Sequence, residues 1–425
     1  MFIADLHIHS HYSRATSRDC ALPDLDLWAR KKGIALLGTG DFTHPAWRAE
    51  LKEALVPAEE GLYRLRDSLR LPCSVAGEVS DPRFLVTGEI SSIYKKDGRT
   101  RKVHNLILLP NLEAAEALSR RLEKIGNLHS DGRPILGLDS RDLLEITLDV
   151  CPDAMLIPAH IWTPHFSMFG AFSGFDSVEA CFGDLSSEIR AFETGLSSDP
   201  PMNWQLSALD PYVMVSNSDA HSPQTLGREA NHFRTACNYP AIRRALRGED
   251  PQGFYGTIEF FPEEGKYHYD GHRNCGVCLT PGETLQTDGI CPVCGKKLTI
   301  GVLHRVEALA DRPAGIIPPG ARPYENLIPL PEVIAASTGF TPASMKVQTC
   351  YEHLLQTLGS EFSILRSLSV SELEPVAGPC VAEGIRRMRA GTLTMDPGYD
   401  GEYGKLHLLE PAEISMLSGL SLIHI

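Results

Sequence analysis

The sequence lacks long hydrophobic runs. No apolar stretch in its 425 residues approaches the roughly 20 residues that a membrane-spanning helix requires, so we expect no membrane span. The chain begins directly with a short apolar strand instead of the basic and apolar segments of a secretory leader, and we therefore expect no signal peptide. Internal repeats and low-complexity tracts are also absent. The composition, 43% hydrophobic and 22% charged residues, is that of a globular protein.

Positive charge is in short supply. The formal net charge of −14 argues against a protein coated in basic surface for nucleic acid, although a metal cluster would neutralise several of the carboxylates. Local basic groups remain, and each is typical of a solvated face as well as of a phosphate contact. These groups are Lys95, Lys96, Arg99, Arg101 and Lys102; Arg243, Arg244 and Arg247; and Arg386, Arg387 and Arg389. Charge alone does not decide the substrate.

Cysteine is infrequent and mostly scattered. Of the 11 cysteines, four form one paired motif, and the other seven lie apart from one another. The scattered ones are Cys20, Cys73, Cys151, Cys181, Cys237, Cys350 and Cys380. We interpret them as reduced core thiols, which indicates a cytoplasmic protein.

The sequence does contain a repeated association of apolar strands with metal-binding side chains. In residues 2–10, His7 and His9 are two positions apart on a predicted strand. Side chains at i and i+2 of a strand face the same way, as two imidazoles sharing a metal must. One such pair is weak evidence, because histidines also pack as core or surface residues. However, the pattern returns at other predicted strands, where the side chains are Glu89, His104, His160, Asp219 and His221.

Predicted strands and helices alternate as far as about residue 262. The clearest helices are 22–32 and 111–125, and strands are predicted near 85–89, 104–109, 155–159, 191–193, 213–216 and 257–261. Alternation of this kind predicts an α/β fold with a parallel sheet, and this many strands favour a closed barrel. In such barrels the chemistry lies at the carboxyl ends of the strands, where the candidate ligands fall.

The composition changes after about residue 267. Two C-x2-C pairs follow, and four thiolates at this spacing are typical of a closed, structural zinc site in a ribbon. Its ligands would be Cys275, Cys278, Cys291 and Cys294. So short a segment cannot build a core without a metal, and two chance pairs of reduced thiols are the alternative. A Pro/Gly-rich linker at 312–331 leads into predicted helices at 330–338, 344–358, 370–373 and 381–390.

These motifs resemble those of the PHP (polymerase and histidinol phosphatase) metal-dependent phosphoesterases. The matching stretches are Asp5-Leu6-His7-Ile8-His9-Ser10, Gly88-Glu89-Ile90-Ser91, Ala159-His160 and Ser218-Asp219-Ala220-His221. Within this family, the chain is most similar to the endonuclease Q branch of DNA-repair nucleases. The features that carry this similarity are residues 39–45, 193–200 and 301–306 and the ribbon. The resemblance covers nearly the whole chain up to about Lys405. The resemblance implies a distorted barrel of seven parallel strands over residues 1–268, a zinc ribbon over 269–305 and a helical, DNA-binding domain over 306–425.

The resemblance also implies a set of metal ligands. One metal would be held by His7, His9, Glu89 and Asp219; a second by Glu89, His104 and His160; and a third by Asp41 and His221, with His44 or His11 as further candidates. Most family members carry Asp-His where this chain has Asp41-Phe42, so Asp41 itself would supply that ligand. A buried, hydrogen-bonded histidine is the alternative at each position, and for His11 and His44 it is the better one.

The implied reaction is hydrolysis of DNA on the 5′ side of a deaminated base (uracil, hypoxanthine or xanthine) or an abasic site. Neighbouring dications lower the pKa of a bound water and neutralise charge in the transition state. Mixed His and carboxylate ligands suit Zn²⁺, with Mn²⁺ or Mg²⁺ at the more oxygen-rich positions. Glu89 and Asp219 would be catalytic, with Asp219 orienting or deprotonating the water.

Substrate contacts are expected in three loops. Arg14 could clamp a phosphate oxygen or be a plain surface arginine. Phe166 and Phe169, in the stretch 162–170, could wedge into a duplex or belong to the core. Residues that could read the edge of a flipped base are Ser197, Ser198 and Asp199. Expected partners are DNA carrying these lesions and, as further candidates, a replication clamp or other repair proteins.

Two other function classes remain open. The first is a small-molecule phosphatase of the histidinol-phosphatase kind, for which the ribbon and the helical tail would be superfluous. The second is a non-catalytic nucleic-acid-binding module. The intact set of metal-binding side chains argues against the second class.

Overall fold

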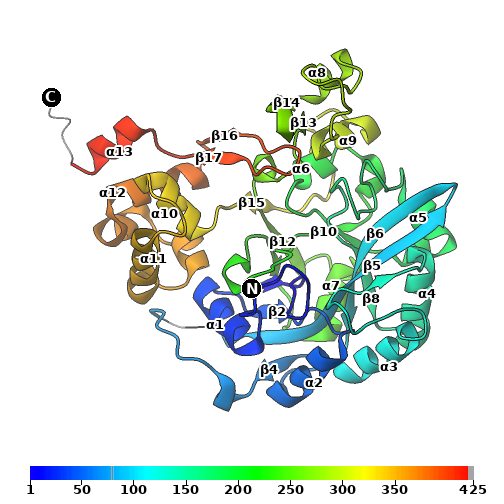
Figure 1. The fold of residues 1–425 in the computed structure, drawn as a ribbon. Coiled ribbons are helices and arrows are strands. Elements are labelled where there is room, and N and C mark those ends of the chain that lie inside the picture. Colours follow the sequence, from blue (N-terminus) through cyan, green and yellow to red (C-terminus); the bar gives the residue numbers. More distant parts are fainter. Residues whose placement is uncertain (78, 80, 420–425) are drawn as a thin grey trace.

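The computed structural model describes residues 1–77, 79 and 81–419 of the chain. They form an α/β fold in which helices surround a large mixed sheet (Figure 1), and the expected α/β class is confirmed. No helix in this described part of the chain is long and apolar enough to cross a membrane.

The large sheet has eleven strands. They are β1 (Phe2–Asp5), β2 (Leu36–Gly38), β3 (Leu55–Pro57), β4 (Tyr63–Leu65), β5 (Arg83–Lys96), β6 (Arg99–Leu109), β7 (Ile135–Leu136), β8 (Met155–Pro158), β11 (Ala230–Phe233), β12 (Phe254–Glu259) and β15 (Tyr324–Asn326). The remaining strands pair two by two: β9 (Ala191–Glu193) with β10 (Val213–Val215), β13 (Asp270–His272) with β14 (Val277–Leu279), and β16 (Thr394–Asp396) with β17 (Lys405–His407).

The sheet is mixed, so the expectation of a parallel sheet was wrong. β1, β2 and β5 pair in parallel, but β6 runs antiparallel to both β5 and β8, and β11 runs antiparallel to β1 and β12. The physical reason is local for β5 and β6. Asp97 and Gly98 both have positive φ, 53° and 72°, which is the backbone of a tight two-residue hairpin turn. The closed barrel stays a prediction.

The helices of the described residues include all those predicted, close to their expected positions, together with others that were not predicted. They are α1 (Leu22–Lys32), α2 (Pro45–Ala54), α3 (Leu112–Leu122), α4 (Ser140–Val150), α5 (Val178–Phe182), α6 (Pro200–Asn203), α7 (Tyr239–Leu246), α8 (Pro281–Gln286), α9 (Val302–Leu309), α10 (Leu330–Thr338), α11 (Met345–Leu358), α12 (Val370–Arg389) and α13 (Pro411–Leu417). α12 joins the two predicted segments 370–373 and 381–390 across a kink at Gly378, whose φ is 77°.

Helix α3 shows why these segments fold as they do. The side-chain carbonyl of Asn111 accepts a hydrogen bond of 2.8 Å from the backbone N–H of Ala114 and so caps the helix. The residues that α3 buries are Leu112, Ala115, Leu118, Ser119 and Leu122. This spacing places one apolar face against the core and leaves the polar face in solvent.

Sharp turns after the strands aim the candidate ligands inward. Asp41, His160 and Asp219 follow β2, β8 and β10, and all three have positive φ, at 49°, 29° and 47°. Non-glycine residues rarely adopt this backbone, and they do so most often where function requires it. Glu89 differs from expectation: it lies within β5, which continues to Lys96 instead of ending at the carboxylate.

The C-terminal part is not a separate appendage. Its helices α10, α11 and α12 lie at one side of the molecule in Figure 1, and the ribbon strands β13 and β14 lie at another. β15 joins the large sheet beside β12. The hairpin β16–β17 returns toward the ribbon, where the backbone N–H of Tyr269 donates to the carbonyl of Gly398 at 3.0 Å. The expected boundaries 1–268, 269–305 and 306–425 stay a prediction, and residues 420–425 lie outside the described part.

Candidate metal centre

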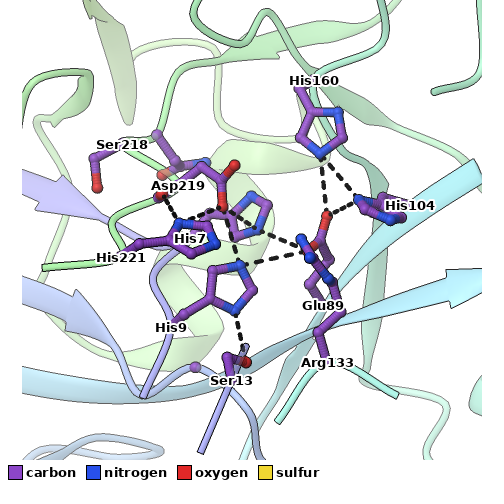
Figure 2. Close-up of polar contacts among 12 residues, drawn as sticks. His7, His9, Ser13, Glu89, His104, Arg133, His160, Ser218, Asp219 and His221 are labelled. Carbon is purple, nitrogen blue, oxygen red and sulfur yellow. Dashed lines mark hydrogen bonds and ion pairs between the residues drawn. The ribbon is translucent and has the colours of Figure 1, made fainter. Parts of the chain in front are cut away.

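Two groups of candidate metal ligands meet at one carboxylate. The first group is His7, His9, Glu89 and Asp219, and the second is Glu89, His104 and His160. Figure 2 shows Glu89 between the two groups, with the imidazoles and Asp219 pointing toward it. All six residues that were predicted to bind the first two metals therefore lie together, and Glu89 belongs to both groups.

In the first group the donor atoms face each other at distances that suit one ion. His9 Nε2 lies 3.0 Å from Asp219 Oδ1 and 3.4 Å from Glu89 Oε2. His7 Nε2 lies 3.6 Å from Asp219 Oδ1 and 3.7 Å from Glu89 Oε2. Two ligands at about 2.0–2.1 Å from a tetrahedral zinc ion lie about 3.4 Å apart, which is close to these separations.

The nitrogen His7 Nε2 is the clearest sign that a metal fits here. It is buried and has no hydrogen-bond partner among the described residues, a costly arrangement for a polar atom. A dication between His7, Glu89 and Asp219 would satisfy it. The donor set of imidazoles and carboxylates also matches zinc chemistry, so the residues present fit the group.

The second group uses the other oxygen of Glu89. His104 Nδ1 lies 2.7 Å and His160 Nε2 3.1 Å from Glu89 Oε1. Burial lowers the pKa of His104 to about 4, so its imidazole is neutral at physiological pH, the form in which histidine binds metals. Burial alone would raise the pKa of Glu89, but His104, Arg133 and His7 hold it well below the ordinary value. Glu89 is therefore an ionised carboxylate placed to bridge two ions.

Glu193 orients two of the ligands. His7 Nδ1 lies 3.1 Å from each carboxylate oxygen of Glu193, and the backbone N–H of His160 donates to Glu193 at 2.9 Å. The side-chain amide of Asn217 donates to the same carboxylate at 2.9 Å. A carboxylate on one ring nitrogen fixes the tautomer and directs the other nitrogen to the metal. The repeated strand-end pattern, in which Glu193 ends β9, contained this signal.

Asp41 orients His9 in the same way. Its carboxylate lies 3.1 Å from His9 Nδ1 and accepts hydrogen bonds from the backbone and hydroxyl of Ser10 and from Ser13. Asp41 therefore lies outside the two candidate metal groups of the described residues. His221 also lies outside them, although its ring is 4.5 Å from that of His9. The third metal stays a prediction.

The two further candidates for that third metal bind backbone carbonyls instead. His11 Nδ1 lies 3.2 Å from the carbonyl of Cys20, and His44 Nε2 lies 3.2 Å from the carbonyl of His129. Both side chains are thus engaged in the structural role that the sequence favoured for them.

The arginine at the centre is Arg133, not the expected Arg14. Arg133 Nη1 lies 3.0 Å from Glu89 Oε2, as Figure 2 shows. The side chain of Arg14 is 76% exposed and points to Asp131, with Nε 3.4 Å from the carboxylate. Sequence reasoning missed Arg133 because it lies in a loop without a motif. The loop approaches closely because Gly132 has no side chain: a Cβ there would lie 2.2 Å from Asp41 Oδ2.

A cavity of about 190 Å³ opens beside the metal ligands. It is lined by His104, Arg133, His160, Thr163, His165, Phe166, Glu193, Gly195, Leu196, Asn217 and Asp219. Phe166 is thus at the cavity, and its contact with substrate stays a prediction. Phe169 is 2% exposed and packs against Trp162 with ring centroids 5.1 Å apart, so it belongs to the core and the expectation of a wedge there was wrong.

The expected base-reading residues after β9 lie elsewhere. Ser197 and Ser198 are 6% and 1% exposed, and neither lines the cavity. Ser198 donates to the carbonyl of Thr194, and Asp199 caps α6 by accepting from Met202. The intervening residues Gly195 and Leu196 line the cavity instead, because the turn after β9 faces it.

The ribbon brings together a different set from the four expected cysteines. The candidate group is His272, Cys275, Cys291 and Cys294. His272 Nδ1 lies 3.5 Å from Cys294 Sγ. Cys278 lies on β14 opposite Gly271 and is outside the group. The spacing His-x2-Cys at 272–275 was the available signal, and the two C-x2-C pairs concealed it because they already formed a complete set.

Sequence comparisons find related proteins. Residues 329–392 match a family model described as the MJ0043 C-terminal domain. The protein YqxK of Bacillus subtilis is 30% identical over 422 residues, which are 95% of this chain and 98% of YqxK. The protein MJ0043 of Methanocaldococcus jannaschii is 33% identical over 254 residues, 58% of this chain and 31% of MJ0043.

Solved structures match over nearly the whole length. The lesion-specific endonuclease PfuEndoQ from Pyrococcus furiosus is 31% identical, with a TM-score of 0.83 over 100% of this chain and 99% of that protein. A second structure, endonuclease Q in complex with a 27-mer duplex substrate with an abasic lesion at the active site, is 31% identical with a TM-score of 0.84, over 97% and 98% of the two chains. On identity, coverage and shared fold together, the chain belongs to the endonuclease Q family.

Proposed function

We propose that this chain is a metal-dependent DNA-repair endonuclease that hydrolyses the phosphodiester on the 5′ side of an abasic site or a deaminated base. The observation that carries the proposal is the pair of ligand groups joined at Glu89, which opens into a cavity. The full-length similarity to an endonuclease bound to a duplex with an abasic lesion supports DNA as the substrate.

Zinc is the proposed ion in the first group of ligands. Manganese or magnesium is the alternative ion in the first group and in the second. Dications bound there would make a water molecule nucleophilic at neutral pH and would neutralise charge on the phosphate. Separate ligand atoms on the two oxygens of Glu89 support a pair of ions. In the ribbon, thiolates and an imidazole support a structural zinc.

The chain's own residues supply the remaining steps. Asp219, whose side chain is 25% exposed at the cavity, is placed to accept a hydrogen bond from the attacking water and so to orient it. Burial alone would raise the pKa of Asp219, but His9, His7 and His221 hold it well below the ordinary value, so it is ionised and available as an acceptor. Arg133 is placed to donate to a non-bridging oxygen of the scissile phosphate.

Lesion choice would rest on extrusion of the nucleotide. A base inside a duplex cannot reach the ligand groups, and removing it from the stack costs a few kcal/mol, least for damaged or mispaired bases. The cavity next to Asp219, with Thr163, Leu196 and Asn217 in its lining, would accept the extruded nucleotide. An abasic site has no base to extrude, which makes it the least demanding substrate.

The proposal is tested by a nicking assay on matched duplexes. They carry thymine, uracil, hypoxanthine or an abasic site at one position, and a generic phosphomonoester is assayed beside them. The expected result is cleavage just 5′ of the three lesions and none at thymine. Equal cleavage of all four duplexes, or turnover of the phosphomonoester alone, would contradict the proposal and favour a general phosphodiesterase or a phosphatase.

The matching variant is Asp219→Asn. An amide coordinates metals weakly and accepts a hydrogen bond less strongly than a carboxylate, so most nicking should be lost while the thermal unfolding midpoint changes little. Retention of full activity by Asp219→Asn, or by the wild type in excess chelator, would refute a metal-dependent mechanism.

Two accompanying assignments are part of the proposal. A cytoplasmic location is supported by the seven scattered cysteines, which are free thiols in this fold. Partners besides DNA, such as a replication clamp or other repair proteins, are proposed only from the resemblance to repair nucleases. Co-purification from a tagged strain checks both.

A further inference from the structure

Two aromatic rings stack on the surface beside the cavity. The rings of His165 and Phe172 have centroids 4.7 Å apart and an angle of 9° between their planes. His165 lines the cavity together with Phe166 and His160. Phe172 is 52% exposed. The outer face of the Phe172 ring is therefore open at the mouth of the candidate active site.

The segment that carries this pair, residues 163–175, is firmly held. Arg305 of α9 donates to the carbonyls of Phe169 at 2.9 Å and Phe175 at 3.0 Å. The guanidinium of Arg101 lies 4.1 Å from the centroid of the Phe175 ring. The backbone N–H of Phe172 donates to the carbonyl of Pro164 at 3.2 Å. The exposed ring is therefore presented by a fixed backbone, not by a loose loop.

Folding does not account for the exposure of Phe172. Among the described residues, the other strongly exposed aromatic rings are Phe340 and Tyr403. Lys346 lies over Phe340, and Lys266 lies over Tyr403, so each of these rings has a cationic partner. Phe172 instead stacks on the ring of His165, which lines the cavity. A stacked aromatic pair beside a cavity presents a flat face on which another ring can stack.

The surroundings indicate what binds there. Lys102 lies 5.0 Å from the centroid of the Phe166 ring, and Arg133 lines the cavity, so two cations are placed where they could contact a phosphate backbone. Burial lowers the pKa of His165, and the positive charge of Lys102 lowers it further. Its imidazole is therefore neutral at physiological pH, and the pair presents a flat, uncharged face. Flat uncharged faces next to cations are what nucleobases stack on.

We propose that the His165–Phe172 pair is a stacking platform for an undamaged nucleobase of the bound DNA, next to or opposite the lesion. This inference rests on the proposed function. When the damaged nucleotide moves into the cavity, the neighbouring base loses a stacking partner, and Phe172 replaces it. The platform differs from the expected wedge at Phe169, whose ring is in the core.

The test is a double-mutant cycle that combines removal of the Phe172 ring with removal of one base of the DNA. Wild type, Phe172→Ala and Phe172→Trp bind duplexes with a stable abasic analogue in the presence of chelator, so that no cleavage occurs, and fluorescence anisotropy gives Kd. Three further duplexes each lack one more base: 5′ of the lesion, 3′ of it, or opposite. Phe340→Ala, which removes an exposed phenylalanine far from the cavity, is the matched control.

Phe172→Ala should weaken binding roughly 5- to 160-fold, the range that base–aromatic stacking spans, and Phe172→Trp should restore it. The loss should disappear on the one duplex that lacks the contacted base. The proposal is overturned if Phe172→Ala binds all duplexes as tightly as Phe340→Ala, if its loss is equal on every duplex, or if sedimentation shows a changed oligomeric state with unchanged affinity. Failure of the wild type to nick lesions would instead refute the proposed function, because the binding cycle needs no cleavage.

Discussion

At the scale of single residues, Gly132 permits an arginine to reach the candidate metal centre. Any side chain at this position would collide with the Asp41 carboxylate, so only glycine allows the loop to come close enough for Arg133 to contact Glu89. Asp131 stabilises the loop by accepting from the backbone N–H groups of Arg14 and Arg133, at 3.3 and 3.2 Å. Three consecutive residues therefore determine where this positive charge lies.

We expect Arg133→Met to lower kcat/KM for nicking by about 10²- to 10³-fold, the usual effect of removing one donor to a developing charge. Arg133→Lys should recover part of the loss, because a point charge replaces a fork of donors. Arg14→Met is the control and should stay within a few-fold of the wild type, since the side chain of Arg14 is 76% exposed and faces Asp131 instead of Glu89. DNA affinity in chelator gives a second measurement that is independent of bound metal.

If Arg14→Met lost as much activity as Arg133→Met, the arginine assignment would have to be reversed.

Several site residues could be predicted because their signal is local. His7 and His9 share a face through the two-residue period of a strand, and Asp219 follows another apolar strand. Arg133 and Phe172 could not be predicted in this way, since loops carry no period. The contact of Asp41 with His9 Nδ1 at 3.1 Å depends on how distant segments pack together, which no spacing in a sequence encodes.

At the scale of elements, the hairpin β5–β6 explains how two ligand groups share one carboxylate. Glu89 and His104 are on neighbouring strands, where Glu89 pairs with Leu106 and His104 with Ser91. The Asp97–Gly98 turn fixes this register. That dipeptide was visible in the sequence and would have predicted the antiparallel pair, whereas the alternation of strands and helices favoured parallel strands throughout.

For the ribbon, His272→Ala and Cys291→Ser should each release about one zinc ion per chain and loosen residues 269–300. Cys278→Ser should keep the zinc, because Cys278 lies outside the candidate group. Metal analysis of the purified variants, with hydrogen exchange over the ribbon, checks this. Zinc loss from Cys278→Ser with retention in His272→Ala would restore the four-cysteine site.

At the scale of the whole molecule, a buried carboxyl couples stability to pH where the sheet region meets the C-terminal helices. Glu264 is 6% exposed, and burial, followed by the charges of Glu332 on α10 and of Glu263, raises its pKa to about 9. The unfolded chain releases this proton near the ordinary value, whereas the folded chain keeps it. The contribution of Glu264 to stability is therefore full below about pH 4.5 and declines as the pH rises toward 9.

Glu264→Gln should remove this pH dependence, because an amide has no proton to lose. We expect the variant to unfold at a higher temperature than the wild type at pH 8 and at nearly the same temperature at pH 5. The slope that disappears is at most about 1.4 kcal/mol per pH unit. Thermal unfolding at several pH values measures it, with Glu263→Gln as the control. An equal difference between wild type and Glu264→Gln at both pH values would contradict the assignment.

The position of Arg305 limits how far this nuclease can be shortened. A fragment that ends at residue 268 would keep every ligand of the two groups at Glu89. It would lose the guanidinium that bonds to Phe169 and Phe175, and it would lose β15, leaving β12 as an unpaired edge. Exposed edges favour aggregation. An attempt to engineer a compact nicking enzyme from the N-terminal region would therefore keep the candidate metal ligands while losing the side chain that supports the loop 163–175.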